Sequence, residues 1–357
     1  TLHLSSAASD VYKRQPLIRP AIIAGVTLVA METLADFGAV QHFAIPTFTT
    51  GIFRTWTGLY DLTTALQLSS ILLFIIFIFL SLERRSRNKI QFSNSESKNN
   101  SFHSIQLTSF KNAFAFFVCF IPVFIGFFLP VIELINWSTQ VDTLISSKII
   151  IAAKNTLYVS SSATILTCFI ALLINYIVRS FGLSQSFNDL LSIGYAVPGL
   201  ILAVGITKMF TSIDFILTDL NIYITGSIFG LVLAYIIKSY AISNNVINSS
   251  FTSIPLSIDE SAKTLKTNRF SILRKIHIPL LKTGLLTAFL LVMGELIKEL
   301  PATLILRPFN FDTLSVSVYL LASEERMFEA AFPGLMIIIF GLIPIYFLNN
   351  LILSNSK

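Results

Sequence analysis

Eight stretches of this chain are long and apolar enough to cross a lipid bilayer as helices. A helix that spans the hydrocarbon core needs about 20 mostly apolar residues. Because the bilayer core offers no water to backbone polar groups, such stretches must satisfy their hydrogen bonds internally, which predicts an all-α membrane protein. The stretches cover residues 20–40, 62–82, 112–135, 153–178, 190–211, 224–242, 282–302 and 331–352.

The composition supports a membrane protein and narrows the function classes. Hydrophobic residues make up 54% of the 357 residues and charged residues 12%, about half the charged share of an average soluble domain. The net charge of +6 does not imply a nucleic-acid partner, because bases gathered on one side of a membrane give the same total. The sequence contains no G-x-x-x-x-G-K-[ST] phosphate loop, so we expect no ATP hydrolysis by this chain itself.

The first fifteen residues differ from the rest of the chain. The segment "TLHLSSAASDVYKRQ" is polar, begins without Met and lacks the apolar core of a signal peptide. Codons that encode "DVYKRQ" can match a transposon end used in sequencing-library preparation. We therefore interpret residues 1–15 as a non-native segment joined to an N-terminally truncated frame. A natural polar terminus is the alternative.

Basic residues fall in alternate segments between the apolar stretches. The segment 83–111 begins "ERRSRNK", and the segment 243–282 contains six Lys and Arg residues. The segments 136–152, 212–223 and 303–330 are poorer in bases and carry acids. Because bases accumulate on the cytoplasmic side, eight alternating spans place 83–111 and 243–282 in the cytoplasm.

The segment that begins at residue 16 repeats the sequence pattern of the segment that begins at residue 279. The segment "PLIRPAIIAGVTLVAMETLADFGA" overlays "PLLKTGLLTAFLLVMGELIKELPA" without a gap. The overlay pairs Pro16 with Pro279, Glu32 with Glu295, and Asp36 with Glu299. At the same offset Phe48 and Thr50 of the exit loop meet Phe311 and Thr313. Repeats of this kind are common in transporters, where the pathway lies between the repeats.

This repeat predicts two homologous halves, of which the first is incomplete. Residues 16–82 are then the remnant of the first half, with its last two transmembrane helices. Residues 83–111 form a cytoplasmic linker. Residues 112–357 form the second half, with six transmembrane helices and the cytoplasmic loop 243–282.

That cytoplasmic loop contains "PLSIDESAKTLKTNRFSILRKIHIPLL" over residues 255–281. A Ser or Asp cap with acids in the first turn predicts a short amphipathic helix over "SIDESAKTL". Such a helix, held between two spans, suits docking into a groove on a soluble partner. An ordinary basic cytoplasmic loop is the alternative.

The loop resembles the signature of the permeases of bacterial ABC importers, which reads E-A-A, then a glycine, then I-x-L-P. The E-A-A positions hold Glu260, Ser261 and Ala262, and the I-x-L-P positions hold Ile276, Ile278 and Pro279. Lys266 stands where the family has a glycine that would allow a left-handed turn. We expect Asn268 to adopt that conformation instead. In the family this loop couples the spans to the ATPase.

Three further segments resemble the fused, two-half permeases of ferric iron importers. They are "METLADFGAVQHFAIPTFTTGIFRTW", "GYAVPGLILAVG" and "KELPATLILRPFNFDTLSVSVY", and the resemblance covers essentially everything from Pro16 onward. It implies a type I ABC importer transmembrane domain in the bacterial inner membrane, without enzymatic activity and without a cofactor of its own.

The resemblance also implies the partners. They are two copies of a cytoplasmic ABC ATPase, which bind ATP and Mg²⁺, an extracytoplasmic substrate-binding protein, and membrane lipid, with no nucleic acid. Related permeases for thiamine, polyamines or sulfate share the loop motif but fit the three segments less well. An ion-coupled secondary transporter would explain the repeat and the acids, but not the spacing from Glu260 to Pro279.

Three charged residues end an apolar run in "MGELIKELPA": Glu295, Lys298 and Glu299. Three charges at the bilayer centre cost about 8–10 kcal/mol, whereas the apolar residues of that span return only about 3–6 kcal/mol. A lipid-facing placement is therefore unfavourable. Small residues, Gly284 and Ala288, lie on the acidic face, which indicates close helix contact. We expect the acids to point into the protein.

Two inward acid pairs related by the repeat, Glu32 with Asp36 and Glu295 with Glu299, predict a four-carboxylate site. Hard cations prefer oxygen ligands, and no cluster of softer ligands competes. One hypothesis is that these acids line the outer pathway and pass a cation such as Fe³⁺, with transient binding at Glu295 and Glu299. The alternative is that the acids form a structural ion pair with Lys298 or simply mark the end of the span. Separately, Pro198 and Gly199 predict a helix kink beside the pathway.

Overall fold

The computed structural model describes residues 22–23, 25–27, 29–88, 108–141, 146–184, 188, 190–220, 223–264 and 268–355. Within these ranges the regular elements are all helical, so the predicted fold class is confirmed. The segment interpreted as non-native (1–15), Lys266 and most of the linker 83–111 lie outside the described residues.

Seven helical segments in the described ranges are long and apolar enough to cross a membrane. They are α4 (Leu62–Asn88); the run of α5 (Ser109–Val123), η1 (Phe124–Phe128) and α6 (Leu129–Ser138); α7 (Ser147–Phe181); α9 (Gly199–Ile216); α10 (Ile228–Thr252); the run of α12 (Arg269–Ile272), η4 (Leu273–His277) and α13 (Ile278–Ile297); and α16 (Met327–Asn355). They match seven of the eight predicted spans. The remaining one, 20–40, lies partly outside the described residues and contributes a shorter apolar helix, Gly25–Ala35.

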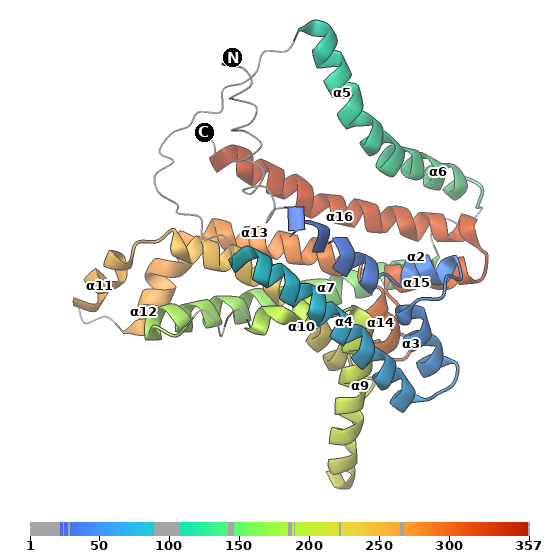
Figure 1. Cartoon of the computed structure of the whole chain (residues 1–357), viewed down its shortest axis with the longest axis horizontal. Helices are drawn as coiled ribbons and strands as arrows, with labels where there is room; N and C mark the ends of the chain where they lie inside the picture. The colour runs from blue at the N-terminus through green and yellow to red at the C-terminus, as the bar shows by residue number, and fades with distance from the viewer. Residues whose placement is uncertain are drawn as a thin grey trace, which may run out of the picture.

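Several shorter helices connect these segments. They are α2 (Gly38–His42), α3 (Phe48–Thr57), η2 (Ser192–Ala196), η3 (Thr218–Leu220), α11 (Leu256–Thr264), α14 (Pro301–Leu306) and α15 (Leu314–Ser323). Figure 1 shows α11 and α12 at one end of the long axis and α2 and α15 at the other. The basic loop and the acid-bearing segment with α14 and α15 therefore lie at opposite ends.

Small and hydroxyl-bearing residues on one face of α7 form the centre of the bundle. Ala152, Thr156, Ser160, Ala163 and Thr167 recur every three or four residues and are all buried. The three hydroxyls donate to carbonyls four residues earlier, so they are satisfied within the helix. Because small residues let helix backbones approach closely, α10 and α13 both pack against α7.

The contact between α10 and α13 depends on the small residues that mark the acidic face of α13. Ala288 is fully buried, and a Cβ placed on Gly284 would lie 2.0 Å from Ser250 Oγ on α10. Close helix contact on this face is therefore confirmed for the second half. A Cβ at Gly25, which the overlay pairs with Ala288, would meet nothing within 4 Å.

The predicted span 190–211 is interrupted rather than continuous. Residues Ser192–Ala196 form a 3₁₀ helix, the backbone is extended at Val197, and α9 begins at Gly199 with Pro198 as its N-cap. Proline lacks an amide donor and disfavours the helical conformation of the residue before it, which favours a helix boundary at Pro198. The result is a break between two helices in place of a bend within one.

Helix α5 stands apart from the bundle. Figure 1 shows α5 leading away from the other helices, whereas α6 runs alongside α16. The Phe-rich face of α5 is exposed, with Phe114, Phe116 and Phe117 each more than half accessible. An apolar surface of this kind on a predicted membrane span is suited to contact with lipid.

The order of elements around the acid pairs occurs twice. A short helix (α2 or α14) is followed by a ten-residue helix with a Thr N-cap (α3 or α15) and then by a long helix (α4 or α16). The N-caps are Thr47 and Thr313, so the pairing of Thr50 with Thr313 in the gapless overlay is wrong by three residues. The second copy is longer because both α14 and the loop that follows it have more residues than their counterparts. The homology of the halves stays a prediction that this parallel supports.

We expect Gly284→Ala to destabilise the packing of α10 against α13. The added methyl group collides with Ser250, and overpacking of this kind costs about 1–3 kcal/mol. The measurement is the midpoint of heat-induced loss of the monodisperse protein in detergent. Gly294→Ala is the matched control, because its Cβ would meet only Pro344 at 3.9 Å. Equal midpoints for the two variants would contradict the predicted collision.

Candidate functional site

A cleft of about 450 Å³ lies where the helix Gly25–Ala35, the segment before α9, α10 and α13 meet. Three acids line it: Glu32, Asp36 and Glu295. Tyr195 and Lys238 add a phenol and an ammonium group to the same cleft. The structure thus brings together residues from both predicted acid pairs, which lie more than 250 positions apart in the chain.

The acids of the cleft are accessible to different degrees. Glu32 is exposed, and Asp36 and Glu295 are half-buried. Glu295 Oε2 lies 3.0 Å from Lys298 Nζ, but the Lys298 side chain is 61% exposed. An ion pair that is so exposed is worth little and exchanges readily with water. Lys298 therefore does not hold Glu295 firmly, and Glu295 lines the cleft.

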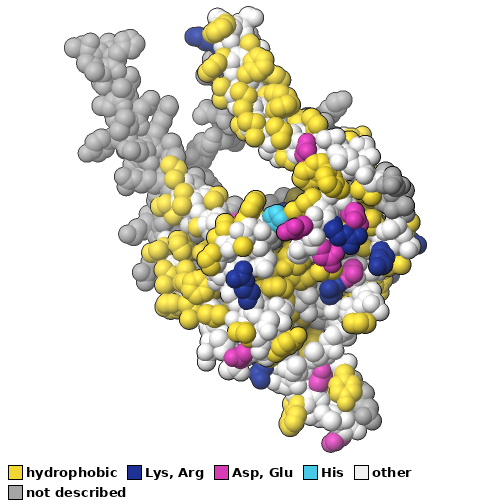
Figure 2. Space-filling model, turned by 90° about the vertical axis from the view of Figure 1, so that its right-hand side faces the viewer, with side chains coloured by type: hydrophobic (Ala, Val, Ile, Leu, Met, Phe, Trp, Pro, Cys, Tyr) yellow, Lys and Arg dark blue, Asp and Glu magenta, His cyan; other side chains and the backbone are white. Residues whose placement is uncertain are grey.

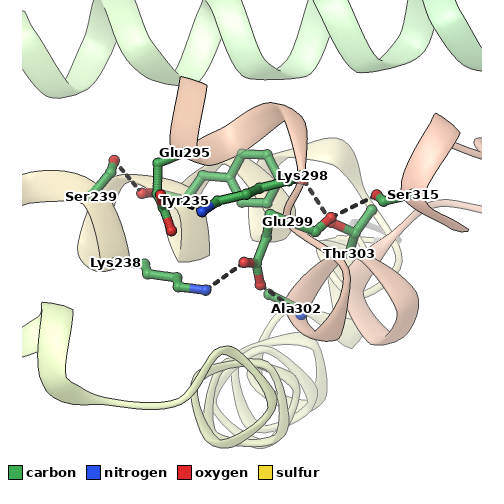
Figure 3. A network of polar contacts seen from close by, with 9 residues as sticks. All are labelled: Tyr235, Lys238, Ser239, Glu295, Lys298, Glu299, Ala302, Thr303 and Ser315. Carbon is green, nitrogen blue, oxygen red and sulfur yellow. Dashed lines mark hydrogen bonds and ion pairs between the residues drawn. The ribbon is translucent and has the colours of Figure 1, made fainter. Parts of the chain in front are cut away.

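Glu299 does not line the cleft with the other three acids. Its side chain is 5% exposed and forms an ion pair with Lys238 of α10 (Figure 3). The other carboxylate oxygen, Oε1, accepts a hydrogen bond of 3.1 Å from the backbone N–H of Ala302. Glu299 therefore caps the first turn of α14 and neutralises Lys238 at the same time.

The carboxylate of Glu299 reaches this position because Gly199 has no side chain. A Cβ at Gly199 would lie 2.5 Å from Glu299 Oε1. Gly199 opens α9 directly after Pro198, and Pro198 itself lines the cleft. The Pro198–Gly199 pair thus lies against the acids, at a break between helices.

Further hydrogen bonds join the turn between α13 and α14 to its neighbours. The carbonyl oxygen of Glu299 accepts from the hydroxyls of Thr303, at 2.9 Å, and Ser315, at 2.8 Å (Figure 3). The hydroxyls of Tyr235 and Thr303 lie 2.6 Å apart. One turn of chain therefore connects α10, α14 and α15 through buried polar contacts, which are costly to break.

The geometry supports weak, shared attraction of a cation. Among the described residues, no group of three or more His, Cys, Asp or Glu side chains is arranged to hold a metal ion. Three acids around an open cleft create a negative field without a closed coordination shell. Such a site can draw in a cation and release it again, as a pathway requires. The pathway role of the acids stays a prediction.

Lys238 is the residue of this site that the sequence analysis missed. It is the only charged residue in the apolar stretch 224–242. An ionisable side chain inside a predicted span is expected to face the protein and to have a partner, so this isolated lysine was a usable signal. Its partner was harder to find, because Glu299 lies 61 residues further along the chain.

The predicted amphipathic helix of the cytoplasmic loop is α11, in which Glu260 and Ser261 are exposed and Ala262 is buried. Ile276 lies in the π-helical turn η4, and Pro279 is in the first turn of α13. The expectation for Asn268 was wrong. Its backbone is extended (φ −66°, ψ 142°), and its side chain accepts from the Phe270 N–H as the N-cap of α12.

A second cavity, of about 560 Å³, lies at the opposite end of the bundle near the start of α16. Figure 2 looks onto this end, where acidic and basic side chains are interspersed. Arg307 forms an ion pair with Asp312, and Arg326 pairs with Glu324 and Glu329. Acidic and basic side chains, including Lys148, both line this cavity, so their charges largely offset one another.

Comparison with known families matches residues 169–354 to the "Binding-protein-dependent transport system inner membrane component". The match covers more than half of the chain. The chain belongs to this family. It is therefore a multi-pass inner membrane permease subunit, which is not itself catalytic and binds no cofactor of its own.

Curated relatives include two ferric permeases of Haemophilus influenzae. The "Fe(3+)-transport system permease protein FbpB 2" is 29% identical over 349 residues, which cover 95% of this chain and 67% of the relative. The "Putative ferric transport system permease protein FbpB 1" is 24% identical, over 89% of this chain and 50% of the relative. The chain thus spans about half to two thirds of the length of these relatives.

A third relative has a different substrate in its name. The "Molybdate/tungstate transport system permease protein WtpB" of Methanocaldococcus jannaschii is 24% identical over 204 residues, which cover 57% of this chain and 81% of the relative.

Solved structures confirm the fold. A bacterial ABC transporter that imports the acidic polysaccharide alginate matches with a TM-score of 0.56 and 16% identity, over 69% of this chain and 98% of that chain. The same transporter in complex with a periplasmic protein bound to an alginate pentasaccharide matches with a TM-score of 0.55 and 18% identity, over 69% and 96%. The fold is that of ABC importer transmembrane domains.

We expect Lys238→Met to destabilise the protein strongly, because it leaves Glu299 charged and buried. Removing one partner of a buried ion pair costs about 3–5 kcal/mol, whereas an exposed pair is worth at most about 1 kcal/mol. Lys298→Met, which removes the exposed partner of Glu295, is the matched control. The measurement is the thermal midpoint in detergent, together with that of Lys238→Met/Glu299→Leu, which should recover part of the loss. If Lys238→Met melts like the control, the structural role of the pair is refuted.

Proposed function

We propose that this chain is the membrane-spanning permease of an ATP-driven importer of ferric iron. The assignment of the substrate rests on the cleft, which Glu32, Asp36 and Glu295 line. Its one lysine, Lys238, is already paired with Glu299, so the cleft has an excess of negative charge. The extended similarity to ferric permeases, over 95% of the chain for one of them, supports a trivalent cation as cargo.

The charge of the cleft argues against anionic cargo. Molybdate and tungstate, the substrates named for one relative, are oxyanions, and so is sulfate. Three carboxylates would repel such ions at every step along the cleft. Oxygen ligands of carboxylates and of the Tyr195 phenol suit a hard cation. Thiamine and polyamines are also cations, and they are the competing cargo that the uptake experiment must separate from iron.

In this proposal, ATP hydrolysis by a partner protein drives the permease through α11. The helix lies at the end of the bundle opposite to α15 (Figure 1), and it presents Glu260 and Ser261 to solvent. We infer that a cytoplasmic ABC ATPase docks there, in a complex with two ATPase copies that bind ATP and Mg²⁺. A substrate-binding protein delivers iron at the α15 end.

We expect Glu32→Gln combined with Glu295→Gln to reduce ferric iron uptake by about tenfold or more, because the cleft loses two of its three lining charges. Uptake of radioactive iron is measured in proteoliposomes that contain the complete transporter. Glu133→Gln, on the exposed face of α6 and outside the cleft lining, is the matched control.

Unchanged uptake in the cleft variant, with a normal control, would reject the pathway role of these acids. Uptake of labelled thiamine or a polyamine by the wild type, without iron uptake, would reject iron as the cargo while retaining the cationic pathway. Competition by molybdate or sulfate but not by other metal ions would reject a cationic cargo altogether.

We expect Glu260→Arg to abolish co-purification of the ATPase, because it reverses a charge on the exposed face of α11. The amount of ATPase retained on affinity-tagged permease is the readout. Ser257→Ala, also on α11 and exposed, is the control. An ion-coupled secondary transporter would import its cargo without any ATPase, so uptake by the permease alone would contradict the ATP-driven function.

A further inference from the structure

The cytoplasmic ends of three helices meet at Arg179, near the end of α7. Its side chain is 11% exposed. The guanidinium donates to the carbonyls of Phe251, at 2.6 Å, and Ile254, at 2.9 Å, where α10 ends. The last carbonyls of a helix have no partner within it, so Arg179 satisfies the end of α10 from the neighbouring helix.

The same guanidinium also holds α11. Arg179 Nε donates to Asp259 Oδ2 at 2.6 Å, and Asp259 lies in the first turn of α11, directly before Glu260. The second oxygen, Oδ1, lies 2.8 Å from His277 Nε2, at the end of η4. Asp259 thus joins α11 to α7 by a charged hydrogen bond and also lies against His277, which precedes α13. Hydrogen bonds of ionised groups are about twice as strong as neutral ones.

Aromatic rings enclose this contact. His277 is 1% exposed, and its ring packs against those of Tyr176, at 5.6 Å, and Phe251, at 5.4 Å, between ring centroids. The Tyr176 hydroxyl donates to the carbonyl of Arg269 at 2.6 Å. Because water is largely excluded, the charged contacts inside are stronger than they would be on an open surface.

Helix α7 leads from this junction to the turn that carries Glu299, beside the cleft. At its other end, Asn155 donates to the carbonyl of Asp312 at 2.9 Å, and Thr156 Oγ1 accepts from the N–H of Leu314 at 2.8 Å. The next residue, Ser315, donates to the carbonyl of Glu299. One unbroken helix of 35 residues therefore connects the Asp259 contact with the turn that carries Glu299.

We propose that Arg179 is a positioning residue, which clamps α11 to α7 through Asp259 so that displacement of α11 by the ATPase moves α7 and, through it, the Glu299 turn at the cleft. Without the clamp, α11 keeps the apolar contact of Ile258 with the core but loses its charged link to α7. The inference rests on the proposed docking of the ATPase at α11.

The test compares the number of iron ions imported per ATP hydrolysed by the complete reconstituted transporter. Arg179→Met and Asp259→Asn should lower this ratio by about tenfold or more, while the bound ATPase still hydrolyses ATP. Arg179→Lys, which keeps the charge but loses the planar fork, should lower it less. Arg269→Met is the matched control, because its guanidinium only stacks on the Phe181 ring, 4.2 Å away at the same end of α7. An unchanged ratio in Arg179→Met would overturn the proposal.

A second measurement applies to variants that do not assemble with the ATPase. Amide hydrogen exchange of α11 in the full-length permease should be about tenfold faster in Arg179→Lys than in the wild type, with exchange in α13 unchanged. Equal exchange in α11 would overturn the clamp. If the wild-type permease binds no ATPase, the proposed function fails, whereas the exchange measurement still decides whether Arg179 holds α11 to α7.

Discussion

The buried ion pair of Lys238 and Glu299 is the interaction on which the candidate site depends. It lies where α13 ends, where α14 begins and where α9 follows the break at Pro198. A lone lysine or glutamate in this setting would cost several kcal/mol, so each residue is tolerable only because the other is present. With Glu299 occupied in this way, the remaining acids, Glu32, Asp36 and Glu295, are left to face the cleft.

The two ends of the bundle are joined mechanically by helices that run between them. At one end, Asp259 is held by Arg179 and His277; at the other, Ser315 holds the Glu299 turn. The close packing of α7, α10 and α13 leaves little room for these helices to move independently. Motion imposed at α11 is thus expected to reach the cleft as a shift of packed helices, which suits a permease that alternates between two states.

Hydropathy and charge predicted the elements of the fold for two reasons. The bilayer core requires backbone polar groups to pair within helices, and basic residues accumulate on the cytoplasmic side. The small residues Gly284 and Ala288 correctly indicated close helix contact. Contacts between distant residues could not be predicted in this way. The pairing of Lys238 with Glu299, and of Arg179 with Asp259, depends on how α7, α10 and α13 pack, which no local pattern encodes. Asn268 illustrates the same limit, since its side chain caps a helix where a left-handed turn was expected.

The central claim is that ATP binding by the ATPase docked at α11 changes access to the acid-lined cleft. Its most direct test is the rate at which a water-soluble thiol reagent labels Thr33→Cys, an exposed position on the cleft wall, after exposed Cys119 has been replaced. The labelling is measured from the α15 side in the complete transporter, with and without a non-hydrolysable ATP analogue. The account predicts clearly different rates in the two states. Identical rates, in a complex that still imports its cargo, would contradict it.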